Sequence, residues 1–222
     1  DVRPLHQVDE RQVVERRDQV DVGDALQDLL HGLLHIGVEV HRIDEAVIRE
    51  ALPPLLRRLD VRSLLDAPCG DGGWISACEL QVDYTGIDIV PSLIAANGLR
   101  AQKSGFSGRY LVRDMTADAL PYADFVLCRD CLVHLGFENI ARAVARFRDS
   151  GARWLLTTTF PEWDENSDCE DGDWRALNLQ KAPFGWPSPI ELINERCDEG
   201  DGGWRDKSLG LWRIADLPMS VV

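Results

Sequence analysis

A regular alternation of short apolar segments and helical patterns, starting near residue 45, most constrains how this chain can fold. The apolar, strand-like segments lie at residues 61–67, 83–89, 109–114, 123–130 and 152–160. Helical patterns lie between most of these segments. Because strands separated by helices of this length form βαβ units, we expect a doubly wound α/β fold with a mostly parallel sheet and helices on both faces.

The helices that connect these strands have recognisable limits. We predict them at residues 45–60, 72–80, 91–103 and just before Gly151. Pro91 falls in the first turn of its helix, where proline is tolerated. Pro53 and Pro54 lie inside the first helical pattern, where the ring and the missing N–H are expected to break or restart the helix.

The carboxyl-terminal part departs from this alternation. Residues 161–189 are rich in Pro, Gly, Asp and Trp and have no helical period, whereas residues 190–197 and 207–217 are strand-like. We expect the last two segments to form a C-terminal antiparallel hairpin. A loop as long as 161–189 in a compact domain usually has a function, and we interpret it as a lid over a ligand site. The equal alternative is that its acids are solvated and its tryptophans form the core of the hairpin.

The first part of the chain has an unusual composition. Residues 1–50 contain no Ser, Thr, Asn, Lys, Cys, Met or aromatic residue and hold four of the five histidines. We therefore divide the chain into an atypical N-terminal helical extension, residues 1–44, and a main domain, residues 45–222, with the hypothesis that the extension is not native to the fold. His31 and His35 have a spacing that can hold a metal, but solvated helix surface is the favoured reading and no metal site is predicted.

Composition limits the partners that this chain can have. The formal net charge of −14 opposes binding to nucleic acid, whose affinity depends on Lys and Arg. The six cysteines are scattered, so we expect free thiols rather than a disulfide framework. The sequence has no secretory signal and no apolar run that could span a membrane, which predicts a cytoplasmic protein. It does not predict the oligomeric state.

A glycine-rich segment at the end of the first strand marks the candidate site. It reads Asp66-Ala-Pro-Cys69-Gly70-Asp71-Gly72-Gly. Glycines there permit a tight turn and a close backbone approach to a ligand, and ligands of open α/β sheets bind at the carboxyl ends of strands. Asp88, at the end of the second strand, suits a carboxylate that binds ribose hydroxyls.

The carboxylates in this segment discriminate between two cofactor classes. A nicotinamide dinucleotide would place its pyrophosphate near Asp66 and Asp71, which would repel it. A cationic ligand fits the segment better. The alternative without a ligand is that both aspartates cap the following helix and the glycines form an ordinary turn.

Several segments resemble the class I S-adenosylmethionine-dependent methyltransferases, which have a Rossmann-like fold. LLDAPCGDGG resembles their first motif, GIDIVPSLI their second-strand signature, RDMTAD their third-strand end and ADFVLCRDCLVHL their fourth strand. Together these cover roughly residues 61–160. DAPCGD, CRDCLVHL, LLTTTFP, GDWRALNL, PIELINE and DKSLGLWR further resemble a bacterial subgroup of these enzymes. Gly72-Gly73 departs from the subgroup, which has bulkier residues there.

The resemblance implies a methyl transferase with S-adenosyl-L-methionine as cofactor and an unidentified, small-molecule acceptor. It implies that Asp66, Gly70 and Gly72 hold the methionine part, Asp88 the ribose, and Asp114 with Met115 the adenine. The remaining residues of the predicted cofactor set are Cys69, Asp71, Ile89 and Arg129.

Methyl transfer requires a positioned nucleophile and, for some acceptors, removal of its proton. We predict Asp130 or His134 as the general base or the group that orients the acceptor; helix capping by Asp130 and packing by His134 are the alternatives. Trp174 and Arg175, in the long loop, are predicted to bind the acceptor. The competing function is a non-catalytic binding protein with the same fold.

Overall fold

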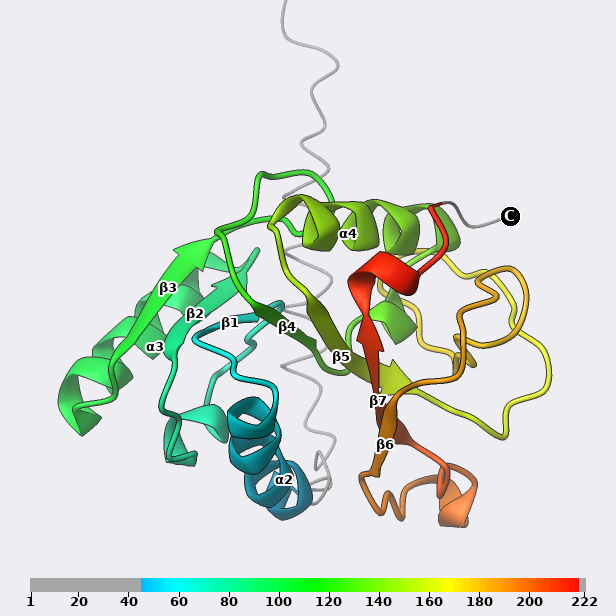
Figure 1. Ribbon diagram of the computed structural model, residues 1–222, viewed down its shortest axis with the longest axis horizontal. Coiled ribbons are helices and arrows are strands. Elements are labelled where there is room, and N and C mark those ends of the chain that lie inside the picture. The colour runs from blue at the N-terminus through cyan, green and yellow to red at the C-terminus, as the bar shows by residue number, and fades with distance from the viewer. Residues whose placement is uncertain (1–44, 220–222) are drawn as a thin grey trace, which may run out of the picture. The chain divides into compact units, whose positions relative to one another are not determined.

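The structure is a computed structural model and describes residues 45–219. Its centre is a 7-stranded sheet with the strand order β3-β2-β1-β4-β5-β7-β6 (Figure 1). The strands are β1 Ser63–Asp66, β2 Asp83–Asp88, β3 Gly108–Val112, β4 Phe125–Cys128, β5 Trp154–Thr159, β6 Glu191–Asn194 and β7 Ser208–Arg213. The first five strands are mutually parallel, and β7 pairs antiparallel with β5 and with β6. This confirms the mostly parallel, Rossmann-like sheet and the C-terminal antiparallel hairpin.

Helices cover the two faces of the sheet. The helix α4, Phe137–Asp149, packs on one face, and α2, Glu45–Arg58, packs on the other (Figure 1). The third helix, α3, Pro91–Ser104, contacts mainly β3 and β2, and Pro91 lies in its first turn as predicted. Its end is set by Gly105, which has the left-handed backbone conformation (φ 74°) that glycine adopts without strain.

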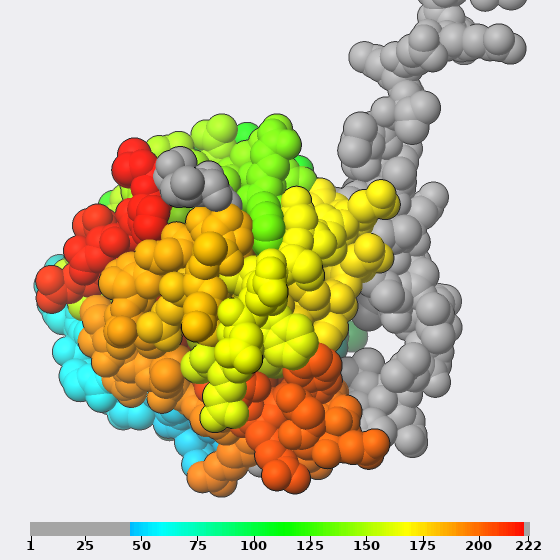
Figure 2. Space-filling model, turned by 90° about the vertical axis from the view of Figure 1, so that its right-hand side faces the viewer, coloured from blue at the N-terminus to red at the C-terminus, as the bar shows by residue number. Residues whose placement is uncertain are grey.

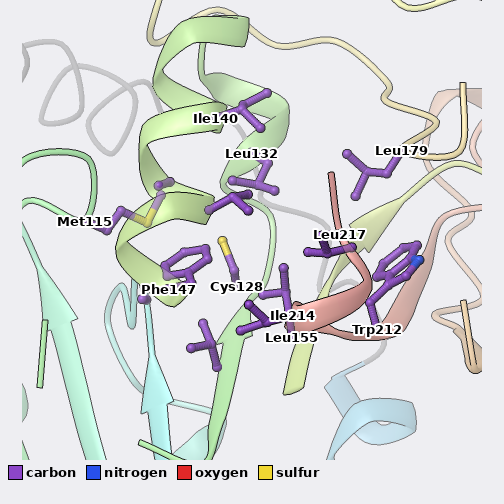
Figure 3. Close-up of a cluster of buried hydrophobic side chains, with 14 of the residues drawn as sticks. Met115, Cys128, Leu132, Ile140, Phe147, Leu155, Leu179, Trp212, Ile214 and Leu217 are labelled. Atoms are coloured by element: carbon purple, nitrogen blue, oxygen red, sulfur yellow. The ribbon is translucent and has the colours of Figure 1, made fainter. Parts of the chain in front are cut away.

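The core under α4 contains the largest buried side chains. Phe147 is fully buried and lies among Cys128 and Leu155 of the sheet (Figure 3). Trp212 of β7 joins the same cluster, and its indole N–H donates to the Pro187 carbonyl at 2.8 Å. The hairpin and the long loop are thus part of the main core rather than an appendage.

The predicted interruption of the first helix is wrong. α2 continues through Pro53 and Pro54 to Arg58. The buried residues Ile48 and Leu52 precede the prolines, and Leu55 follows them on the same face. Burying a leucine side chain contributes about 1.5–3 kcal/mol, so burial on both sides offsets the cost of proline, about 3 kcal/mol in a helix interior.

The predicted helix at residues 72–80 is also wrong. The structure has a single 3-10 turn there, Ile75–Ala77, followed by extended backbone at Cys78. Gly72 has φ 58°, which no right-handed helix can include. The paired glycines also raise the entropy cost of helix formation.

Residues 161–189 are all described by the structure and contain no helix or strand, as predicted. No helix between residues 45 and 219 is long and apolar enough to cross a bilayer. The predicted helical extension, residues 1–44, with His31 and His35, lies outside the described residues.

Replacing Pro54 by alanine tests the account of α2. Alanine restores the N–H that Pro54 lacks, at an exposed position. We expect the Pro54→Ala variant to be about 1–3 kcal/mol more stable to unfolding, as measured by urea denaturation. Arg57→Ala, an exposed substitution in the same helix, serves as the control and should change stability by less than about 0.5 kcal/mol. A Pro54→Ala protein that is less stable than the original would contradict a continuous helix.

Candidate active site

The candidate site lies where the winding order of the sheet reverses. β1 lies between β2 and β4, and chain connections leave it in both directions. In such sheets the loops beyond the carboxyl ends of these strands diverge and leave a crevice. Asp66 ends β1, Asp88 ends β2, and Arg129 follows β4. The predicted cofactor residues are therefore gathered at one edge of the sheet.

The glycine-rich loop after β1 has the backbone conformation that its glycines were expected to provide. Gly70 and Gly72 have φ angles of 52° and 58°. A side chain built on Gly70 would meet no atom within 4 Å, so open space lies over this residue. A side chain on Gly72 would meet the Asn97 amide at 3.3 Å, and that amide donates to the Gly70 carbonyl at 2.8 Å. The loop is held from α3 and is open on its other side.

Asp88 fixes the same loop from β2. Its Oδ2 accepts from the Gly70 N–H at 3.1 Å and its Oδ1 from the Val90 N–H at 2.9 Å. Burial raises the pKa of this carboxyl, and the backbone N–H groups partly offset the shift. Asp88 thus has a structural role in the loop. The carboxylate, with about four lone-pair sites, still has capacity for a ligand hydroxyl.

Asp66 is almost fully buried, and its Oδ2 accepts from the Tyr84 hydroxyl at 2.8 Å. Burial raises the pKa of Asp66 to about 7, although Tyr84 and the charge of Arg129 lower it. At neutral pH this carboxyl is therefore close to half-protonated. Because Asp66 is only partly charged, the expected repulsion of a pyrophosphate depends more on Asp71. Asp71 is exposed, and its Oδ1 accepts from the Gly73 N–H at 3.0 Å.

The other predicted cofactor residues flank this loop. Asp114 follows β3, and its Oδ1 accepts from the N–H and the hydroxyl of Thr116, both at 2.7 Å. Met115 is buried in the core under α4. Cys69 is buried, burial raises the pKa of its thiol, and it lies beside Asn97. Ile89 follows Asp88 and is half-buried.

A cluster of four charged side chains, Arg129, Asp130, Glu195 and Lys207, joins the end of β4 to the C-terminal hairpin. Arg129 Nε lies 2.6 Å from Glu195 Oε1, and Lys207 Nζ lies 2.7 Å from Asp130 Oδ1. Longer ion pairs link Arg129 Nη2 to Asp130 Oδ2 at 3.8 Å and Lys207 Nζ to Glu195 Oε2 at 3.7 Å. Only Asp130 has appreciable exposure, with 30% of its side chain accessible. We call these residues the ion cluster.

Two buried atoms of the ion cluster lack a hydrogen-bond partner among the described residues. They are Arg129 Nη2 and Glu195 Oε2. Leaving a buried donor or acceptor without a partner costs about 1–3 kcal/mol. Arg129 also lies over the ring of Trp74, 5.7 Å from its centroid, and its charge acts on Asp66. Arg129, whose Nη2 lacks a hydrogen bond within residues 45–219, thus lies beside the residue that follows the glycine-rich loop.

Asp130 has a left-handed backbone conformation, with φ 52°. A residue other than glycine in this region is uncommon and is found most often at turns and functional sites. The Thr158 hydroxyl, on β5, accepts from the Asp130 N–H at 2.8 Å. This hydrogen bond and the left-handed backbone thus position Asp130 just after the carboxyl end of β4, beside β5.

His134 ends the 3-10 turn Leu132–His134, which follows β4. Its Nδ1 lies 3.0 Å from the Asp173 carbonyl oxygen. A carbonyl only accepts hydrogen bonds, so Nδ1 carries the proton and Nε2 holds a lone pair. Burial lowers the pKa of His134 below its usual 6.5, and the Asp173 carbonyl and the charge of Asp130 offset part of this shift. The ring is therefore neutral at pH 7.

The long loop is tied to the elements beside the site. Asp171 Oδ1 accepts from the Gly136 N–H at 2.7 Å, and Asp168 Oδ1 from the Phe137 N–H at 2.8 Å. Both bonds satisfy donors at the start of α4. Figure 2 shows the segment from about residue 160 to 190, in yellow to light orange, covering one face of the protein. These two hydrogen bonds attach the loop to the start of α4; the lid itself stays a prediction.

The two predicted acceptor-binding residues have different environments. Arg175 is buried, and its guanidinium donates to the carbonyls of Ser167, Leu132 and Leu135. These bonds hold the loop against the turn after β4. Trp174 is 45% exposed, a large fraction for a tryptophan, and is available to a ligand.

The sequence analysis missed Glu195 and Lys207 as site residues. Both are buried charges with ionic partners in the predicted site. The available signal was their position: Glu195 follows β6 and Lys207 precedes β7, inside the segments PIELINE and DKSLGLWR. Charges at the mouth of an apolar hairpin point to an ionic partner.

A separate cavity of about 850 Å³ opens at the amino-terminal ends of the strands. Ser63, Thr85, Arg109 and Asp124 are among its lining residues. It lies at the opposite edge of the sheet from Asp66 and Asp88, and no predicted site residue lines it. No group of three or more potential metal ligands occurs within residues 45–219.

Residues 64–150 match the family model of a methyltransferase domain. The matched segment starts in β1 and ends after α4, so it contains the glycine-rich loop, Asp88, Asp114, Arg129 and His134. Glu195 and Lys207 lie outside it. A search of curated protein sequences finds no match.

Several solved structures are similar to this chain. The Burkholderia thailandensis 1,6-didemethyltoxoflavin-N1-methyltransferase, solved with 1,6-didemethyltoxoflavin and S-adenosylhomocysteine, is 19% identical, with a TM-score of 0.60 over 90% of this chain and 92% of that one. The magnesium protoporphyrin IX methyltransferase of Synechocystis is 16% identical, with a TM-score of 0.48 over 66% and 74% of the two chains. The PH0226 protein of Pyrococcus horikoshii is 20% identical, with a TM-score of 0.45 over 56% of this chain and 60% of that one. The match thus spans less than two thirds of that last protein.

The raised pKa of Asp66 predicts a specific pH dependence of stability. Between about pH 4 and pH 7 the unfolded carboxyl is ionised while the folded one keeps its proton, so the free energy of unfolding falls as pH rises. Asp66→Asn removes this dependence. We expect the variant to gain roughly 3–4 kcal/mol relative to the original protein between pH 4 and pH 8, measured by denaturant unfolding. Asp198→Asn, at an exposed position, is the control, and an equal pH dependence in all three proteins would refute the shift.

Proposed function

We propose that the chain is a class I S-adenosyl-L-methionine-dependent methyltransferase that acts on a small-molecule acceptor, and that residues 45–222 form its catalytic domain. The observation that carries this proposal is the coincidence of the methyltransferase-domain match, residues 64–150, with the crevice at the reversal of the sheet. Fold likeness alone would not support an activity. The chemistry of the residues at that crevice is the second support.

The residues present fit the cofactor. Its amino acid end carries a carboxylate and an ammonium group. In the described part of the chain, Arg129 Nη2 has no hydrogen bond and offers a donor to the carboxylate, whereas Asp66 and Glu195 Oε2, which also has no hydrogen bond, offer acceptors to the ammonium group. The open space over Gly70 accommodates the close approach of such a ligand.

The remaining predicted residues would hold the nucleoside. Asp88 has lone pairs for the ribose hydroxyls, and Ile89 follows it. Asp114 and Met115 would border the adenine. Gly72, Asp71 and Cys69 shape the loop between the two ends of the cofactor.

When bound, S-adenosyl-L-methionine supplies a methyl group activated by its sulfonium. The task of the protein is then to position the acceptor and to remove a proton from it. His134 suits the second task because it is neutral at pH 7 and its Nε2 holds a lone pair. Asp130 is held by Lys207 and Thr158 and suits the positioning of the methyl acceptor. Lys207 binds Oδ1, so Oδ2 can accept a hydrogen bond from the acceptor molecule.

The acceptor would lie along the loop at residues 161–189. Trp174 supplies an exposed aromatic surface there, and Arg175 fixes the segment that presents it. A small molecule, 1,6-didemethyltoxoflavin, is bound to the Burkholderia enzyme, whose fold is similar.

Binding of S-adenosylhomocysteine, measured by calorimetry, tests the cofactor proposal. We expect saturable binding by the full chain. Arg129→Met removes the donor to the ligand carboxylate and should weaken binding by about ten- to a hundredfold. Arg142→Met, on the exposed side of α4, is the control and should bind normally. A folded protein that shows no binding heat for this nucleoside would overturn the proposed function.

The pH dependence of turnover tests His134. Activity requires the neutral imidazole, so with its lowered pKa the rate should hold down to about pH 6.5 and fall at lower pH. His134→Gln should lower kcat by about 10²–10⁴-fold and remove this acidic limb. Asp130→Asn should raise KM more than it lowers kcat. An unchanged acidic limb in His134→Gln would exclude His134 as the base.

A further inference from the structure

We propose that the atom that receives the methyl group is an amine nitrogen, and that the acceptor's positive charge lies against the exposed tryptophans beside the site. This inference rests on the proposed function and names the chemical class of its acceptor. It is drawn from an aromatic cluster, from the charges around that cluster and from the protonation of His134.

The aromatic cluster consists of Phe160, Trp163, Trp174 and Trp204. The ring centroids of Trp174 and Trp204 are 4.7 Å apart with an interplanar angle of 71°, and Phe160 packs edge-on against both at 6.0 and 5.8 Å. Trp163 contacts Trp204 at 5.8 Å. Trp163 and Trp174 remain 40% and 45% exposed. Adjacent exposed tryptophans on a folded protein mark a ligand or partner surface.

Hydrogen bonds connect this cluster to the candidate catalytic residues. Trp174 follows Asp173, whose carbonyl lies against His134 Nδ1. The Trp204 carbonyl accepts from the Lys207 N–H at 3.0 Å, and Lys207 binds Asp130. A ligand on the exposed rings is therefore next to the elements that hold the proposed base and its neighbour. Figure 2 shows the yellow segment that contains Trp174 lying beside the orange-red turn that contains Trp204.

The charges near the exposed rings favour a cation. Glu162 and Asp164 flank Trp163, and Asp173 precedes Trp174. Three cations belong to the neighbouring segments. Arg175 donates to main-chain carbonyls and Lys207 binds Asp130, whereas Arg205 follows Trp204 and is exposed. The acids Glu162, Asp164, Asp173 and Asp206 outnumber this exposed arginine. A cation over a tryptophan ring is attracted by the ring quadrupole, whereas an anion is repelled by the ring face and by these carboxylates.

The acids that tether the loop do not contribute to this argument. Asp168 and Asp171 are bound to the N–H groups at the start of α4. The selection for a positive charge therefore depends on the aromatic rings and on the acids next to them. It is not a consequence of the net acidity of the loop.

An amine also matches the chemistry of His134. A protonated amine transfers a proton to His134 Nε2, which gives an imidazolium and a free amine. The amine lone pair then forms a bond to the methyl carbon as the carbon–sulfur bond breaks and its electron pair stays on sulfur. The products are an N-methylated ammonium ion and S-adenosylhomocysteine, and the imidazolium returns its proton to solvent. No further reactant is required.

Three probes of the same size and different charge test this inference: benzylamine, which is cationic at pH 7, benzyl alcohol and benzoate. Binding of each to the full chain in saturating S-adenosylhomocysteine is measured by ligand-observed NMR titration. We expect benzylamine to bind at least about tenfold more tightly than benzyl alcohol, and benzoate to bind weakest. Equal or tighter binding of benzyl alcohol or benzoate overturns the proposal. A lysine-containing peptide that binds more tightly than benzylamine overturns the small-molecule source of the amine.

Variants of the aromatic cluster test whether benzylamine binds at the exposed tryptophans. Trp174→Leu should weaken benzylamine binding about tenfold, while Trp174→Phe keeps a ring and most of the affinity. Tyr122→Leu removes an exposed aromatic side chain at the other end of the sheet and should have no effect. An unchanged affinity in Trp174→Leu contradicts the proposal.

S-adenosylhomocysteine calorimetry on the same samples separates the two proposals. If the nucleoside binds and the probes show no charge preference, the amine inference fails and the proposed function stands. If the nucleoside does not bind to the folded protein, the proposed function fails and the amine inference falls with it.

Discussion

The pairing of Arg129 with Glu195 is the interaction on which the candidate site depends. It joins the end of β4, within the segment that matches the methyltransferase domain, to the hairpin that follows the long loop. Burying either charge alone would be strongly unfavourable, so each side chain requires the other in place. Lys207 and Asp130 extend the pairing, and the four charges together fix the relative position of the central sheet and its antiparallel extension.

This constraint explains how a small domain forms a site without several helices. Only a 3-10 turn lies between β1 and β2, and the connection from β3 to β4 contains no helix. The glycine-rich loop is instead held by side chains, with Asp88 on one side and Asn97 on the other. The long loop is likewise held by Asp171 and Arg175. Side-chain bonds to the backbone thus hold both loops beside the candidate site.

The sequence was sufficient to predict the sheet, because apolar segments and their spacing determine strands directly. All five predicted parallel strands and the hairpin are present, and Asp66, Asp88 and Arg129 gather at one edge. Local propensity failed at two helices. In α2, the burial of Leu52 and Leu55 stabilises the helix enough to offset the unfavourable prolines. After Gly72, the left-handed backbone of that glycine prevents a helix. The ion cluster could not be predicted because Arg129 and Glu195 are 66 residues apart and only the fold brings them together.

The separation of the ion-cluster residues along the sequence limits which part of the chain can form the site. Arg129 and Glu195 are 66 residues apart, and Lys207 lies further along the sequence. A shortened chain that stops before β6 would keep the guanidinium of Arg129 and lose the buried carboxylate that pairs with it. The segment that matches the methyltransferase domain, residues 64–150, therefore depends on residues outside it to neutralise a charge at the candidate site.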